Sequence, residues 1–140
     1  MAMTITLAKD VTHGNPSWSR RVRELRFSIS TTGGTASGTS AEIPAVSGYV
    51  IGVKAEPSSS SPPANGWGVK LLDRAGFDLL QGSGLLLPNN TSSSYAVQRM
   101  PVDTKNSASI FLLNEAVRVD VSGFGSTNAS ADIVFYLLLP

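Results

Sequence analysis

The sequence contains no cysteine and one histidine, His13. The missing thiols exclude disulfide bridges, thiolate zinc sites and cysteine nucleophiles, and they are typical of proteins made in a reducing cytoplasm. One histidine cannot form a histidine-based metal cluster, and it leaves any serine triad dependent on that residue. Because no G-x-S-x-G elbow is present and Gly14 and Pro16 follow His13, a loop residue is favoured over a catalytic base.

Charge is also scarce. Charged residues make up 15% of the chain and the net charge is +1, against about 25% charged residues in an average soluble domain. The whole molecule therefore has no electrostatic attraction to nucleic acid or to an anionic membrane, and neither is expected as a partner. The first seven residues lack the basic and apolar regions of a secretion signal, so we expect no signal peptide. No motif for a metal or a cofactor is present, and no cofactor is expected.

Helical periodicity is nearly absent, and 13 glycines and 8 prolines interrupt the chain too often for helices of ordinary length. Short segments that alternate apolar and polar residues dominate instead. Eight to ten such segments, separated by turn signals, predict an all-β fold, an antiparallel β-sandwich that is jelly-roll-like. We expect a single domain over residues 1–140, in which residues 1–19 can form an extended N-terminal arm.

The faces of several strands can be predicted from the alternation. In the segment 20–30 the residues of one face are apolar, and a second stripe runs from residue 49 to residue 55. Residues 107–113 and 117–122 are predicted as two further strands, and residues 67–81 as a hairpin that turns at Arg74–Gly76. The predicted apolar faces are Leu25, Phe27 and Ile29; Tyr49, Ile51, Val53 and Ala55; and Val117, Val119 and Val121.

The residues from Ile133 to Leu139 are apolar at every position. Seven residues are too few to span a bilayer, which needs about twenty. A strand that is apolar on both faces is covered twice, either inside a two-layer core or by another subunit. We predict that Ile133, Phe135 and Leu137 fill the core, and that Val134, Tyr136 and Leu138 contact a neighbouring subunit. The expected strand partner is residues 117–122, although the segment 126–130 allows a longer crossover.

The main concentration of charge is Arg20, Arg21, Arg23 and Arg26, with Glu24 among them. Because successive residues of a strand face opposite sides, Arg20 and Arg26 share one face while Arg21 and Arg23 share the other. The cluster is therefore split and lacks the continuous basic stripe with exposed aromatics that nucleic-acid binding favours. An acidic protein partner is the preferred interpretation, and a solvated strand edge is the alternative.

Two tryptophans and two aspartates are further candidates. Trp18 and Trp67 could stack on sugar rings, but a core position or an interface anchor is favoured for each. Asp73 and Asp78 flank the turn at Arg74–Gly76, and an aspartate before a glycine turn normally caps that turn. No second carboxylate is placed beside either one for acid–base catalysis, and no calcium-loop motif is present. No catalytic or metal-binding residue is therefore predicted.

Residues 67–84, Trp-Gly-Val-Lys-Leu-Leu-Asp-Arg-Ala-Gly-Phe-Asp-Leu-Leu-Gln-Gly-Ser-Gly, resemble a strand, turn, strand and glycine pattern of small virion proteins from tailed bacteriophages. The strand at 117–122, the glycine turn and the apolar final strand are similar to the end of those proteins. The chain thus resembles a capsid cement, or decoration, protein of a short-tailed bacteriophage. The resemblance covers about half of the chain.

The resemblance implies a non-enzymatic protein on the capsid exterior, made in the host cytoplasm, that bridges neighbouring subunits of the major capsid protein and forms homodimers. It also implies that residues 20–26, with Trp18 and the N-terminal arm, dock on the shell, and that the C-terminal strand is a core or dimer element. Two alternatives remain open at this stage. One is a tail, connector or fibre-base component of the virion, and the other is a carbohydrate-binding module that uses Trp18 or Trp67.

Overall fold

Eight strands and no helix make up the part of the chain described by the structure, a computed structural model. The described residues are 3–14, 21–32, 37–80, 98–99, 111–125 and 128–139. The strands are β1 (Met3–Gly14), β2 (Arg21–Thr31), β3 (Gly38–Thr39), β4 (Ile43–Pro57), β5 (Gly68–Leu72), β6 (Gln98–Arg99), β7 (Phe111–Ser122) and β8 (Ala129–Leu138). The described part therefore contains no helix that could span a membrane.

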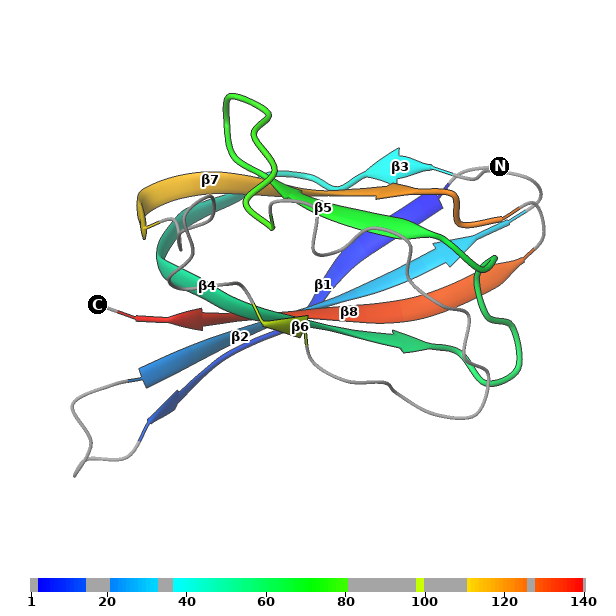
Figure 1. Ribbon diagram of the computed structural model, residues 1–140, viewed down its shortest axis with the longest axis horizontal. Helices are drawn as coiled ribbons and strands as arrows, with labels where there is room; N and C mark the ends of the chain where they lie inside the picture. Colours follow the sequence, from blue (N-terminus) through cyan, green and yellow to red (C-terminus); the bar gives the residue numbers. More distant parts are fainter. Residues whose placement is uncertain are drawn as a thin grey trace.

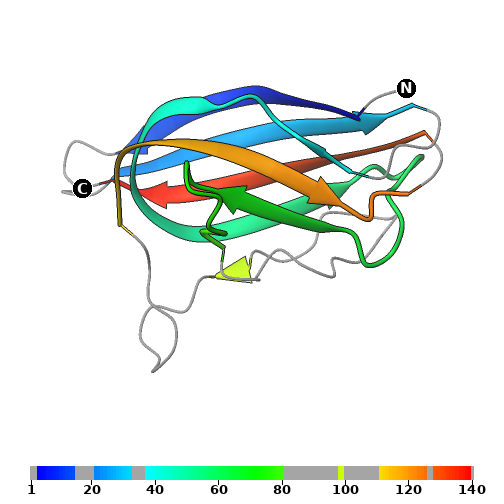
Figure 2. The same ribbon diagram turned by 90° about the horizontal axis from the view of Figure 1, so that it is seen from above.

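The strands form one curled antiparallel sheet in the order β1-β2-β8-β4-β7-β3, with β5 also paired to β7 and β6 to β4. The sheet folds over into two layers (Figures 1 and 2). The large layer consists of β1, β2, β8, the second half of β4 and the short strand β6 that pairs with it, and the small layer consists of β3, β5, β7 and the first half of β4. The predicted all-β antiparallel sandwich is confirmed. The jelly-roll connectivity stays a prediction.

The strand β4 passes from one layer to the other because its backbone is irregular at the corner. Its register with β7 shifts twice, between Ile43 and Val46 and between Val46 and Gly48. Ala45 has a φ of 59° and Asn114, on the facing strand, has a φ of 54°. The backbone N–H of Asn114 donates a 2.8 Å hydrogen bond to Ser47 Oγ. Bulges of this kind bend a strand and increase its twist, which here turns β4 over the core.

The left-handed backbone at Ala45 leads to a stability prediction. An L-residue with a side chain pays roughly 1–2 kcal/mol for this conformation, whereas glycine adopts it freely. Ala45 is exposed, so its methyl group contributes little packing. We expect Ala45→Gly to raise the free energy of unfolding by about 0.5–1 kcal/mol in urea denaturation. The matched control is Ala41→Gly, at an exposed residue without positive φ, which should lower stability; equal effects of the two changes would contradict the argument.

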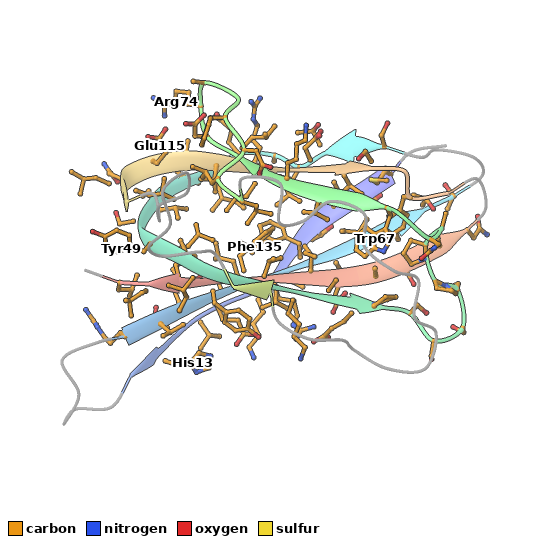
Figure 3. All side chains as sticks on the ribbon, viewed as in Figure 1. His13, Tyr49, Trp67, Arg74, Glu115 and Phe135 are labelled. Carbon is orange, nitrogen blue, oxygen red and sulfur yellow. The ribbon has the colours of Figure 1, made fainter. Side chains whose placement is uncertain are left out.

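The core lies between the two layers and is closed by aromatic pairs. Phe27 and Phe135 meet edge to face with ring centroids 5.7 Å apart, and Trp67 and Phe124 do so at 5.3 Å. Figure 3 shows Phe135 between the layers. Several predicted inner faces are confirmed, because their side chains are buried: Leu25, Phe27 and Ile29 of β2; Val117, Val119 and Val121 of β7; and Ile133, Phe135 and Leu137 of β8.

The predicted partner of the terminal strand is wrong. The strand β8 lies between β2 and β4, and β7 is not among its neighbours. The chain does not reverse within one layer after β7. It crosses from the small layer to the large one, with Phe124 buried on the way and with positive φ at Gly123 and Gly125.

Three other expectations are corrected. Residues 3–14 of the expected N-terminal arm form the edge strand β1, paired with β2 along its length. The stripe predicted from residue 49 is wrong in its first half, because a register shift between Val50 and Gly52 turns Val50 inward and leaves Tyr49 39% exposed. The second half of the predicted hairpin makes one isolated bridge, from Leu72 to Asp78, and its last residue, Gln81, lies outside the described part.

Candidate protein-binding face

The outer face of the large layer carries most of the predicted site residues that the structure describes. Side chains alternate across a strand, so the residues of β2 that do not face the core point to this surface. The ladders place Arg26 opposite Val134 of β8, and Val134 opposite Lys54 of β4. They also place Glu24 opposite Tyr136 and Val22 opposite Leu138. One half of the face is charged and the other half is mainly apolar.

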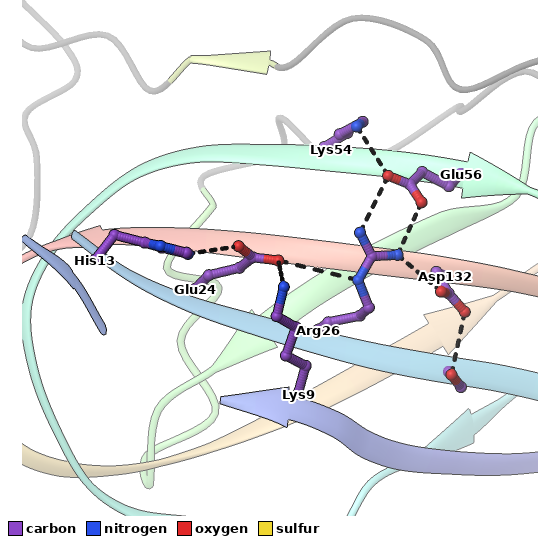
Figure 4. Close-up of polar contacts among 8 residues, drawn as sticks. Lys9, His13, Glu24, Arg26, Lys54, Glu56 and Asp132 are labelled. Carbon is purple, nitrogen blue, oxygen red and sulfur yellow. Dashed lines mark hydrogen bonds and ion pairs between the residues drawn. The ribbon is translucent and has the colours of Figure 1, made fainter. Parts of the chain in front are cut away.

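Arg26 is the centre of the charged half (Figure 4). Its Nη1 donates 2.8 Å hydrogen bonds to Glu56 Oε1 and to Asp132 Oδ2, and its Nη2 donates a 3.3 Å bond to Glu56 Oε2. Glu24 Oε2 lies 4.0 Å from Arg26 Nε. One guanidinium thus holds carboxylates from β2, β4 and β8, which makes it a cross-link of three strands of the large layer.

Further cations complete this network. Lys54 Nζ lies 2.9 Å from Glu56 Oε2, and Lys9 Nζ lies 3.6 Å from Glu24 Oε2. His13 Nε2 lies 3.0 Å from Glu24 Oε1, so the histidine predicted in a loop is a paired residue of β1. With His13 neutral, three cations (Lys9, Arg26 and Lys54) face three carboxylates (Glu24, Glu56 and Asp132). The charged half is therefore electrically neutral.

The carboxylate pKa values follow from these contacts. The hydrogen bond from Arg26, with a further contribution from Lys54, lowers the pKa of Glu56 from 4.5 to about 2. The hydrogen bond to His13 is the main cause of the lowered pKa of Glu24, and burial opposes it. Hydrogen bonding to Glu56 raises the pKa of Arg26 and of Lys54. All of these charges are consequently fixed at neutral pH.

The predicted arginine cluster is divided by its contacts. Arg23 forms a two-pronged pair with Asp10, from Nε to Oδ1 at 2.9 Å and from Nη2 to Oδ2 at 2.8 Å, which joins β2 to β1. Arg26 is committed to the network, and Arg21 is exposed without an ion pair to any described residue. Arg20 and Trp18 lie outside the described residues. Arg23 and Arg26 therefore neutralise carboxylates of their own chain, and the acidic protein partner expected for the cluster stays a prediction.

The apolar half of the face lies at the end of β8. Val22, Leu138 and Tyr49 form a row across β2, β8 and β4, and Tyr136 lies beside it. Tyr136 and Leu138 are half-buried, so each keeps part of its surface available for a partner. Val134, which was predicted in the same interface, is 0% exposed. This part of the prediction is wrong: Arg26 and Lys54 stand on either side of Val134, and their long stems can cover an apolar neighbour.

The remaining candidate residues have structural roles. Trp67 is fully buried, which excludes it as a sugar-stacking platform. Asp73 caps its turn as predicted, because the N–H of Phe77 donates a 2.8 Å bond to Asp73 Oδ1. Asp78 accepts a 3.0 Å bond from the N–H of Leu80. Within the described residues, no group of three or more histidines and carboxylates has the geometry of a metal site.

Sequence reasoning missed the acceptors of Arg26. Glu56 and Asp132 are 30 and 106 residues away from it along the chain, and only the strand register brings them together. The available signal was weak: Glu56 follows Lys54 on one face of its strand, and Asp132 directly precedes the apolar terminal run.

Comparison of the chain with protein-family models, with curated proteins and with solved structures finds no match.

Proposed function

We propose that this protein is a non-enzymatic structural component of a bacteriophage virion, a jelly-roll-like cement protein that binds the outside of the capsid and bridges neighbouring major capsid protein subunits. The observation that carries the proposal is the outer face of the large layer. It combines a neutral, internally paired charge network with an apolar row at Val22, Leu138 and Tyr49. The sequence resemblance to cement proteins supports the same conclusion.

The two halves of this face would contribute to binding in different ways. Paired charges that are held in place across three strands make a rigid surface, and a rigid surface loses little conformational entropy on association. The apolar row supplies area that is removed from water when a partner covers it. A small contact is sufficient for a cement protein, because many copies on one shell add modest interfaces into a large total stabilisation.

The direct test is binding of the purified protein to assembled shells that lack it. We expect co-sedimentation at micromolar protein concentration and a higher melting temperature of the decorated shells. Localisation in particle images distinguishes cement from a tail or connector part, because cement is present in hundreds of copies and a tail part in a few. Absence of shell binding at micromolar concentration would reject the proposal.

Tyr136 is the residue to change within the proposed interface. Tyr136→Glu places a charge in the apolar half of the face, where Lys54 lies near enough in the monomer to offset the repulsion from Glu24 on the neighbouring strand. We expect the affinity for shells, and for a second copy, to fall by about tenfold or more while the monomer stays folded. The matched control is Phe77→Glu, which charges an exposed aromatic residue on the turn after β5. Equal losses for both variants would argue against this face as the interface.

A further inference from the structure

The curled sheet does not close on itself. Its two outer members, β1 and β3, lie side by side at the open seam (Figures 1 and 2). The strands are close at the end of the seam, where a Cβ on Gly38 would stand 3.0 Å from the Cβ of Met3. Among the described residues, however, β1 forms a ladder with β2 and β3 forms one with β7, and none joins β1 to β3. The seam is thus bordered by two strand edges.

The beginning of β1 has few of the features that protect an edge strand. In an antiparallel pair, alternate residues point their N–H and C=O groups away from the partner strand, and these groups can pair with another chain. Natural edges are usually guarded by charges, prolines or bulges. In β1 the bulge lies between Leu7 and Lys9, and the first charge is Lys9 itself. Residues 3–7, Met-Thr-Ile-Thr-Leu, contain none of these protections, and β3 approaches this stretch at its first residue, Met3.

An apolar groove lies beside this unprotected stretch. It has a volume of about 260 Å³ and is lined by Ile5, Leu7 and Phe27 on one side and by residues 40–44 on the other. Leu7 is 37% exposed there. A strand added to β1 would alternate its side chains, so every second one would point into this groove. The groove therefore supplies pockets for side chains, and the edge of β1 supplies backbone partners, which are the two requirements of strand addition.

The negative charge of Glu42 beside the groove restricts which kind of segment can bind there. Glu42 lines the groove, is exposed, and makes no ion pair with a described residue. No lysine or arginine is among the lining residues. A basic residue on the added strand would complement this carboxylate. A second copy of the chain fits less well, because a two-fold axis at the seam would bring two Glu42 carboxylates toward each other.

We propose that the edge of β1 at residues 3–7 binds an extended segment of another protein by strand addition. Alternate apolar side chains of that segment enter the groove beside Ile5 and Leu7, and a lysine or arginine pairs with Glu42. The site lies at the edge of the large layer, away from the apolar row on its outer face. It does not depend on the capsid proposal, since it can be tested on the purified protein without any shell.

The test uses the full-length protein labelled with ¹⁵N and a synthetic peptide of eleven residues that alternates valine with lysine and threonine. We expect amide shifts confined to residues 3–7 and 40–43, with a Kd of the order of 100 µM, which is typical of weak peptide binding. Leu7→Lys puts a charge into the groove, as edge strands do naturally, and should weaken binding by about tenfold. Leu113→Lys changes a leucine that is 73% exposed on β7 and should leave binding unchanged.

A charge exchange tests the role of Glu42. Glu42→Lys should weaken binding of the lysine peptide by about fivefold and favour a matched peptide with glutamate in place of lysine. Because Glu42 is exposed, this variant also serves if Leu7→Lys fails to fold. Three results would overturn the proposal: no shifts at 1 mM of either peptide (about ten times the expected Kd), shifts that map to another surface, or self-association through β1 that excludes the peptide.

Discussion

Gly48→Ala should be among the most destabilising single changes in the described part of this protein. Gly48 has a φ of 116°, a conformation that costs a residue with a side chain roughly 1–3 kcal/mol. A Cβ at this position would also lie 2.5 Å from the backbone oxygen of Leu138 and 3.2 Å from its carbonyl carbon. Backbone atoms of a central strand cannot move aside as the tip of a side chain can. We expect a loss of about 3–4 kcal/mol in the free energy of unfolding, measured by urea denaturation.

Gly66→Ala separates the two contributions to this loss. Gly66 has a comparable φ of 86°, but a Cβ there would meet nothing within 4 Å. We expect this variant to lose only about 1–2 kcal/mol, which is the backbone cost alone. The difference between the two glycines then measures how closely β4 approaches the end of β8. If Gly48→Ala were no worse than Gly66→Ala, the close approach at Leu138 would be refuted.

The corner of β4 shows why part of the fold could be predicted from the sequence and part could not. The alternation of Leu25, Phe27 and Ile29, or of the three valines of β7, is a local pattern, and it predicted the buried faces correctly. The corner of β4 has no such pattern. It is formed by Ala45 and Asn114, which adopt a left-handed backbone because the facing strand and Ser47 hold them there. The predicted stripe from residue 49 therefore failed where the register shifts.

The pairing of strands that are distant in the sequence could not be predicted from it either. The seven apolar residues at the end predicted a strand covered on both sides, but not that β2 and β4 would flank it. Tyr136 and Leu138 lie on the outer face as expected, whereas Val134 is buried within the chain, at a position that the register places between Arg26 and Lys54. The arginines were predicted on two faces, and the division agrees with the strand alternation for Arg21, Arg23 and Arg26, whereas Arg20 lies outside the described residues. The ion pairs of Arg23 and Arg26 were not predicted, because the sequence alone does not distinguish an arginine that binds carboxylates of its own chain from one that binds another protein.

Arg26→Met should destabilise the protein strongly at neutral pH. The change keeps the long stem but leaves Glu56 and Asp132 close together without the guanidinium that bridges them. Removing one partner of a buried ion pair costs about 3–5 kcal/mol. The three side chains here are between a fifth and about a third exposed, so water screens part of this cost. We expect a loss of about 2–3 kcal/mol at pH 7.

The effect should disappear in acid, and the sign follows from the pKa of Glu56. Arg26, with a further contribution from Lys54, lowers that pKa from 4.5 to about 2, so the stabilisation is fully present above pH 4.5 and is lost as the pH falls toward 2. In Arg26→Met the main cause of the depression is gone and only Lys54 still lowers the pKa, so Glu56 is protonated at a higher pH and its repulsion with Asp132 is relieved as the pH falls. The unfolding free energies of the two proteins should therefore converge between pH 4.5 and pH 2. A difference that stays constant over this range would mean that packing of the stem, and not charge, accounts for the loss.

Two further variants assign the loss to the network. Arg21→Met removes the same charge from an exposed residue of the same strand and should change stability by no more than about 0.5 kcal/mol. Adding Glu56→Gln to Arg26→Met removes one of the opposed carboxylates and should recover part of the stability at pH 7. Residues in one ion-pair network are coupled, so the double variant should be more stable than the sum of the single changes predicts. Strict additivity would show that Arg26 and Glu56 act independently, and that the charged half of the outer face is not the rigid unit on which the proposed binding surface depends.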